Sequence, residues 1–241
     1  MLVTGSGTPV TVVAHGFGAS IPESRALASG ILGTKLFPQA RGHGAAPVPV
    51  QPGYGELATD LVAVADAHDA TQALGTSMGA HTVLRLLATQ PARFARLVLF
   101  LPAAIDTPVR RRSELAEALA SRERERVLSV VQQEVLPLSG ERVAGYAQAR
   151  TDFLLASAGL PELLEALPDD VPVPDRAVLG AVQADVLVIG QEGDPVHPAA
   201  VARELAAALP TARLVVFDEP GAAFLERARL RALISDHLTP G

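Results

Sequence analysis

The fold of this chain is decided by the stretch Thr71-Gln72-Ala73-Leu74-Gly75-Thr76-Ser77-Met78-Gly79-Ala80-His81, in which a short apolar run ends in Gly-Thr-Ser-Met-Gly. An apolar pattern with helical spacing begins directly behind it, so this G-x-S-x-G sequence stands between a predicted strand and a predicted helix. A strand that turns abruptly into a helix strains its central residue, and the residues two positions away must be small, as Gly75 and Gly79 are. We therefore expect the Ser77 hydroxyl to stand above a sheet edge, with the Met78 N–H at the positive end of a helix. The alternative is a small-residue turn in which Ser77 is a bystander.

Composition excludes several classes of site and partner. A chain of 241 residues that is 49% hydrophobic can form one domain with a sizeable core. The absence of cysteine excludes disulfides, thiolate catalysis and cysteine-ligated metals, and the net charge of −6 argues against nucleic acid as a partner. No apolar run approaches the roughly 18 residues of a transmembrane helix, and no basic and apolar leader begins the chain. We expect a cytoplasmic protein that binds a small molecule and does not enter a membrane.

Strand-like and helical patterns alternate along most of the chain. Apolar runs typical of buried strands occur at residues 10–14, 34–37, 70–75, 96–101, 185–189 and 213–217. Solid apolar strands separated by helices predict a mostly parallel α/β sheet covered on both faces. Residues 107–175 break the alternation with helical patterns only, so we expect a helical cap there and a core formed by 1–106 and 176–241. The charged runs Arg110–Arg112 and Arg122–Arg126 are predicted to be solvated helix faces.

Four glycine-containing motifs follow predicted strands in order. They are His15–Gly18 after the first strand, Arg41–Gly44 after the second, Gly75–Gly79 after the third and Gly190–Pro198 after the fifth. The carboxyl ends of parallel strands share one sheet edge, so the motifs should converge on one crevice. In these motifs and their order the chain resembles the α/β-hydrolase fold family. The resemblance implies a three-layer fold, and the few residues before the first strand predict a shortened sheet of about six strands.

The resemblance also implies roles for individual residues. Ser77 matches the nucleophile, and the backbone N–H groups of Phe17 and Met78 match the oxyanion hole that stabilises a tetrahedral intermediate. Asp194 matches the acid that orients a histidine, although an aspartate before a proline can also simply cap a turn. Asp106 is a less favoured alternative acid. No cofactor and no metal are implied.

One position departs from the family pattern. The family's general base is a histidine in the loop after the last strand, and Ala223 stands in its place. A serine hydroxyl is a weak nucleophile without a base, and a triad that lacks one member keeps only about 10³–10⁴-fold catalysis over water. Two interpretations stay open. One is a serine hydrolase of esters or amides of small apolar substrates with weak or atypical activity. The other is a non-hydrolytic relative, either a ligand-binding protein or a lyase or isomerase that uses the same pocket.

The histidines of the chain include one candidate for a replacement base. His197 lies three residues after Asp194 in the same predicted loop, although its place before Pro198 also suits the start of a helix. The histidines fall on separate elements without the spacing of a metal site. For the others we expect a brace within the glycine-rich loop at His43, a backbone hydrogen bond at His15, a side chain directed away from Ser77 at His81, and surface positions at His68 and His237.

Overall fold

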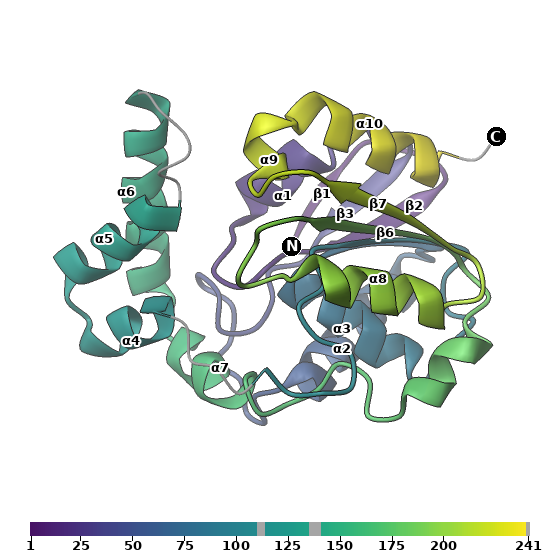
Figure 1. Ribbon diagram of the computed structural model, residues 1–241, viewed down its shortest axis with the longest axis horizontal. Helices are drawn as coiled ribbons and strands as arrows, with labels where there is room; N and C mark the ends of the chain where they lie inside the picture. Colours follow the sequence, from purple (N-terminus) through teal and green to yellow (C-terminus); the bar gives the residue numbers. More distant parts are fainter. Residues whose placement is uncertain (110–113, 135–140, 240–241) are drawn as a thin grey trace.

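The computed structural model describes residues 1–109, 114–134 and 141–239, and the predicted helix face at Arg110–Arg112 lies outside the described residues. The chain forms one sheet between two layers of helices (Figure 1). Seven strands are hydrogen-bonded in the order β1-β3-β2-β4-β5-β6-β7. Their bounds are β1 Leu2–Thr4, β2 Val10–Ala14, β3 Thr34–Phe37, β4 Gln72–Thr76, β5 Arg96–Phe100, β6 Asp185–Gln191 and β7 Ala212–Phe217.

The sheet contains one strand more than the sequence predicts. β1 pairs antiparallel to β3, with Leu2 opposite Phe37 and Thr4 opposite Lys35, whereas all other neighbouring strands are parallel. Three residues are too few to show the alternation by which a strand is recognised. They suffice for an edge strand here because Leu2 packs against the buried apolar cluster beneath the sheet.

Helices cover both faces of the sheet (Figure 1). α1 (Ile21–Leu27), α9 (Ala222–Leu225) and α10 (Arg227–Leu238) lie on one face, and α2 (Tyr54–Ala67), α3 (Met78–Leu87) and α8 (Ala199–Ala208) on the other. A short 3₁₀ helix at Arg176–Ala181 leads into β6.

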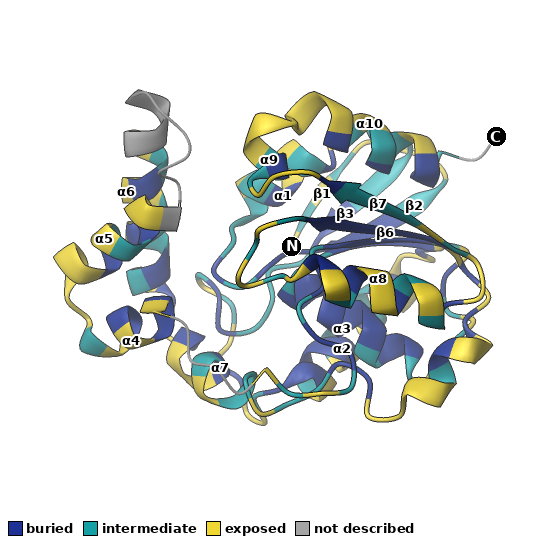
Figure 2. Ribbon diagram, in the orientation of Figure 1, coloured by how far each residue is buried: buried dark blue, intermediate teal, exposed yellow. Residues whose placement is uncertain are grey.

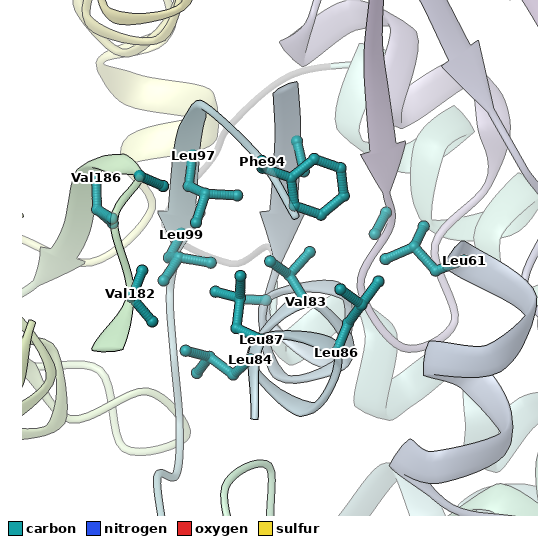
Figure 3. Close-up of a cluster of buried hydrophobic side chains, with 14 of the residues drawn as sticks. Leu61, Val83, Leu84, Leu86, Leu87, Phe94, Leu97, Leu99, Val182 and Val186 are labelled. Carbon is teal, nitrogen blue, oxygen red and sulfur yellow. The ribbon is translucent and has the colours of Figure 1, made fainter. Parts of the chain in front are cut away.

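The largest apolar cluster lies between β4 and β5 and helix α3. Figure 3 shows Leu97 and Leu99 of β5 facing Val83, Leu84 and Leu87 of α3. Side chains at alternate β5 positions, Val98 and Phe100, point into the cluster on the opposite face. The inner strands are therefore buried on both sides (Figure 2), which explains why their sequences are apolar without alternation.

In the described residues between β5 and β6, four α-helices precede the 3₁₀ helix. They are α4 (Glu114–Ser121), α5 (Arg124–Glu134), α6 (Glu141–Ala156) and α7 (Leu160–Ala166), and they lie beside one end of the sheet (Figure 1). These helices form an apolar cluster of their own. Phe17, in the loop after β2, packs against it. The run Arg122–Arg126 is exposed, with Arg124 paired to Asp152, as expected of a solvated face. None of the helices in the described ranges has both the length and the hydropathy needed to cross a membrane.

Helix α3 approaches the sheet at glycine positions. A Cβ atom on Gly79 would lie 2.1 Å from the carbonyl oxygen of Ala14 in β2, and one on Gly75 would lie 2.7 Å from the Cα atom of Ala80. These contacts are with backbone atoms, which cannot rotate away. The two glycines of G-T-S-M-G therefore allow the strand and the helix to meet at van der Waals distance.

The replacement Gly79→Ala should lower the free energy of unfolding by about 3 kcal/mol or prevent folding, because the added methyl group overlaps the backbone of β2. The matched control is Gly55→Ala on the exposed face of α2, where a Cβ atom meets nothing within 4 Å. That change should stabilise the protein by about 0.4–1 kcal/mol. Urea unfolding of the two variants measures both effects, and equal stability of the two would contradict the close approach.

Candidate active site

Ser77 occupies a strained turn between β4 and α3. Its backbone has φ 50° and ψ −113°, a region that residues with a side chain seldom adopt. The conformation is held from both sides, because the Ser77 N–H donates to the Phe100 carbonyl at 2.8 Å and the Ser77 carbonyl accepts from the His81 N–H at 3.0 Å. The turn directs the hydroxyl out of the sheet and into a cavity.

The Ser77 hydroxyl is hydrogen-bonded to a histidine. Its Oγ atom lies 2.9 Å from Nε2 of His197, and Nδ1 of His197 lies 2.9 Å from Oδ2 of Asp194. A carboxylate can only accept, so Nδ1 carries the proton and Nε2 is free to accept from the serine. The three side chains thus form one chain of hydrogen bonds in the order expected of a nucleophile, a base and an orienting acid.

Asp194 and His197 are brought together by a tight turn in the loop after β6. Oδ1 of Asp194 accepts the backbone N–H groups of Val196 at 2.8 Å and of His197 at 3.0 Å. This turn folds the chain back, so a histidine only three residues along can reach its own aspartate. Partial burial of Asp194 opposes its ionisation, but the hydrogen bonds from His197, with a hydrogen bond from Gln191, outweigh burial and hold the pKa of the carboxyl well below its usual range.

The turn that carries Phe17 is fixed on two sides. Nε2 of His43 accepts the Gly18 N–H at 2.9 Å, and Nη1 of Arg150 on α6 donates to the Gly18 carbonyl at 3.1 Å. Within the described part of the chain, the backbone N–H groups of Phe17 and Met78 donate no hydrogen bond, and both residues line the cavity beside Ser77. Two unpaired N–H groups next to a nucleophile are the donors that a developing oxyanion needs.

The cavity at Ser77 has a volume of about 620 Å³. Most of its wall is apolar, and one group of apolar lining residues comes from the segment between β5 and β6 that holds α4 and α7. These lining residues are Leu115, Ala116, Leu163, Leu164, Leu167 and Pro168. A cavity of this size with a few convergent polar groups suits a small organic molecule.

Comparison with known proteins agrees with this architecture. A family model described as TAP-like protein matches residues 166–240. The structure is similar to an esterase (EaEST) from Exiguobacterium antarcticum, with a TM-score of 0.82 and 21% identity over 98% of this chain and 94% of the other. It is also similar to the enol-lactonase from Burkholderia xenovorans LB400, with a TM-score of 0.81 and 22% identity over 99% and 95% of the two chains. An α/β hydrolase enzyme from a Medee basin deep-sea metagenome library, MGS-M2, gives a TM-score of 0.85 at 15% identity over 100% and 94%. The chain has the α/β-hydrolase fold.

Within this α/β-hydrolase fold, every site residue expected from the sequence lies at one cavity. Phe17, Ser77, Met78, Asp194 and His197 all line it, and so does Ala223. Ala223 is the second residue of α9, which Gly221 caps, and it packs against the apolar cluster beneath the sheet.

The alternative acid Asp106 lies elsewhere. Its Oδ1 atom pairs with Arg176 at 2.8 Å, and Asp106 is not among the residues that line the cavity. In this α/β-hydrolase fold the side chain that contacts His197 is therefore Asp194.

Most of the remaining histidines form hydrogen bonds with backbone groups. Nδ1 of His15 donates to the Gly16 carbonyl at 2.9 Å, and Nδ1 of His43 donates to Arg41, as expected of residues that brace their loops. The imidazole of His81 hydrogen-bonds to Tyr54 and not to the Ser77 hydroxyl, and His68 is exposed. The surface position predicted for His237 is wrong. The end of α10 packs beneath the start of β6, so His237 is buried and hydrogen-bonds to the Asp185 carbonyl at 3.1 Å.

Three residues of the site carried no signal in the sequence. Gln191 contacts Asp194, Arg150 contacts the Phe17 turn, and Tyr54 hydrogen-bonds to His81 at 2.8 Å. The contacts of Arg150 and Tyr54, and those of Gln191 with the Gly221 and Ala222 N–H groups, join distant segments, which a single sequence gives no means of pairing. Across the described ranges, no group of three or more histidine, aspartate or glutamate side chains could hold a metal ion.

Three buried histidines are held in the neutral form. Burial, with the neighbouring His15, lowers the pKa of His43 to about 3, and burial, with the neighbouring His197, lowers the pKa of His81 to about 3. Burial also lowers the pKa of His15. Each of the three uses Nε2 to accept at least one backbone N–H, so a proton at that atom would break a hydrogen bond as well as place a charge in the interior.

The free energy of unfolding should therefore fall as the pH drops below about 6.5. The unfolded chain takes up protons at His43 and His81 while the folded chain does not until about pH 3, so each of these two contributes a slope of up to about 1.4 kcal/mol per pH unit. Urea unfolding over a series of pH values measures the slope. His81→Gln should reduce it, whereas the exposed His68→Gln should not. An unchanged slope in His81→Gln would contradict the assignment of a neutral, buried imidazole.

Proposed function

We propose that the protein is a serine hydrolase that cleaves esters, or amides, of small apolar substrates. Ser77 is the nucleophile, His197 the general base and Asp194 the residue that orients the imidazole. The observation that carries this proposal is the chain of hydrogen bonds from Ser77 through His197 to Asp194, with 2.9 Å at each step. The esterase and the enol-lactonase of the same fold agree with it in reaction class.

The reaction follows from the positions of the protons. As Oγ of Ser77 attacks the substrate carbonyl carbon, Nε2 of His197 takes the hydroxyl proton and the carbonyl oxygen becomes an anion. The N–H groups of Phe17 and Met78 stabilise that oxygen. The C–O or C–N bond then breaks, and the imidazolium returns its proton to the departing alcohol or amine.

The acyl group is released by the same machinery. His197 removes a proton from a water molecule, whose oxygen attacks the acyl carbon and forms a second tetrahedral intermediate. When that intermediate collapses, the bond to Ser77 breaks and the serine regains its proton from His197. The ionised Asp194 stabilises the imidazolium in both halves of the cycle.

The helices between β5 and β6 act in this proposal as the cap that selects the substrate. α4 and α7 supply part of the apolar wall of the cavity, and Arg150 of α6 also contacts the turn that carries Phe17. An apolar wall favours an uncharged acyl or alcohol group of small size.

The non-hydrolytic alternative rested on the missing histidine at Ala223. A pocket that only binds a ligand has no need for an imidazole held between a strained serine and a buried aspartate. The hydrogen-bonded His197 therefore supports the hydrolase over a binding protein.

Ester hydrolysis tests the proposal. With an aryl ester of a short fatty acid as substrate, Ser77→Ala and His197→Ala should each lower kcat/KM by at least about 10³-fold, since each removes a member of a unit that acts together. His68→Ala, which changes an exposed histidine, should leave kcat/KM unchanged. Turnover that survives in Ser77→Ala would exclude the mechanism.

The position of the base can be tested in the same assay. In the double variant His197→Ala, Ala223→His, the imidazole is moved to another lining position of the same cavity, the one at which the α/β-hydrolase resemblance places the base, and part of the activity should return. Ala223→His alone should give no gain, because the base is already supplied. A large gain from Ala223→His alone, with no loss in His197→Ala, would show that His197 is not the base.

A further inference from the structure

A base and an acid on one loop need a fixed position relative to the serine. Asp194 accepts two backbone N–H groups from its own turn, at Val196 and His197. Those bonds set the internal shape of the loop, but they do not tie it to the body of the protein. Ser77 belongs to a different element, the turn between β4 and α3, so some other contact must hold the loop in register with it.

Gln191 makes such a contact. It is the last residue of β6, and its side chain is 5% exposed. Its Nε2 atom donates to Oδ2 of Asp194 at 2.6 Å, and its Oε1 atom accepts the backbone N–H groups of Gly221 at 3.1 Å and of Ala222 at 3.2 Å. Two backbone donors face Oε1 and a carboxylate faces Nε2, so the orientation of the amide is determined by its partners.

The segment at Gly221 presents these donors because of its conformation. Gly221 has φ 92°, in the left-handed region, and caps the short helix α9. Its N–H and that of Ala222 therefore turn toward Gln191 instead of pairing within a strand. The next residue is Ala223, the position where the family's histidine is expected.

From this geometry we infer that Gln191 is a positioning residue for the reaction. It fastens the Asp194–His197 pair to the segment at Gly221 and Ala222, and it sets the rotation of the Asp194 carboxylate by occupying the same oxygen that His197 contacts. The segment at Gly221–Ala223, where the resemblance places the histidine, thus holds His197 in position through Gln191 and Asp194. This inference rests on the proposed function, because positioning matters only if His197 acts on Ser77.

Two substitutions distinguish the contribution of the Gln191 donor, which contacts Asp194, from that of its acceptor, which contacts Gly221 and Ala222. Gln191→Met keeps the length of the side chain and removes both hydrogen-bonding groups. Gln191→Glu keeps an acceptor for Gly221 and Ala222 but removes the donor to Asp194 and places a second carboxylate beside it. Both variants should lower kcat by about 10–100-fold with a much smaller change in KM, because the base is less well oriented while Gln191 is only one of the many residues that line the cavity.

The matched control is Gln72→Met. Gln72 is similarly buried, at 3% exposed, and its amide makes two hydrogen bonds, with the Thr11 side chain and with the Leu238 carbonyl. Its loss should lower the free energy of unfolding without changing kcat. A fall in kcat common to Gln72→Met and Gln191→Met would show a general structural effect and overturn the inference.

A spectroscopic measurement keeps the test independent of turnover. The proton on Nδ1 of His197, shared with Asp194, should give a low-field ¹H NMR resonance that is lost in His197→Ala. Gln191→Met and Gln191→Glu should shift or broaden this resonance, and Gln72→Met should not. An unchanged resonance and unchanged kcat in Gln191→Met, or no such resonance in the unmodified protein, would overturn the role of Gln191. If Ser77→Ala retained turnover while the resonance still responded to Gln191, the hydrolase mechanism would fail and the positioning of the pair would stand.

Discussion

The hydrogen bond between Oγ of Ser77 and Nε2 of His197 is the interaction on which the site depends. It joins two segments that are 120 residues apart in the sequence and that belong to different elements. On one side stands a serine in a strained turn, held by backbone bonds to Phe100 and His81. On the other stands an imidazole held by an ionised carboxylate three residues earlier. Strain at one partner and a tight turn at the other are both maintained by the packed sheet beneath them.

In the proposed mechanism the base lies on a different segment from the one at which the α/β-hydrolase resemblance places it. What the chemistry needs is an imidazole nitrogen within hydrogen-bond distance of the serine and a carboxylate at the other nitrogen. The segment of the chain that supplies the imidazole is not dictated by that requirement. Here the Asp194 turn supplies both groups, and the segment after β7 carries a small side chain at Ala223 and offers backbone N–H groups to Gln191.

Helix α6, between β5 and β6, makes polar contacts with residues near the same site. On α6, Arg150 donates to the Gly18 carbonyl, and Tyr146 donates to Glu23 at 2.6 Å, the glutamate that caps α1. The ring of Tyr146 also packs edge-on against Phe224, at 5.7 Å between centroids. Helix α6 is therefore joined to the turn that carries Phe17, to the start of α1 and to the end of α9.

Much of the fold could be predicted from the sequence, because the inner strands are buried on both faces and their apolar runs have no helical period. The exception is β1, whose three residues are too few to show a pattern. The turn at Ser77 could also be predicted, since Gly75 and Gly79 are small for a steric reason that a single sequence displays. The contact of His197 with Ser77 was harder to predict, because a histidine before a proline is equally consistent with the start of a helix. Gln191 and His237 depend on contacts between distant segments, for which the chain has no local signal.

The most direct test of the central claim, that His197 activates Ser77, is the rate at which a fluorophosphonate probe modifies the protein, followed by mass spectrometry. The serine oxygen attacks phosphorus and fluoride leaves, so the added mass marks the activated serine. The account predicts modification at Ser77 alone in the unmodified protein and in the exposed-residue control His68→Ala. The rate should fall by at least about 10³-fold in His197→Ala. Modification of Ser77 in His197→Ala at the rate of the unmodified protein would contradict the account.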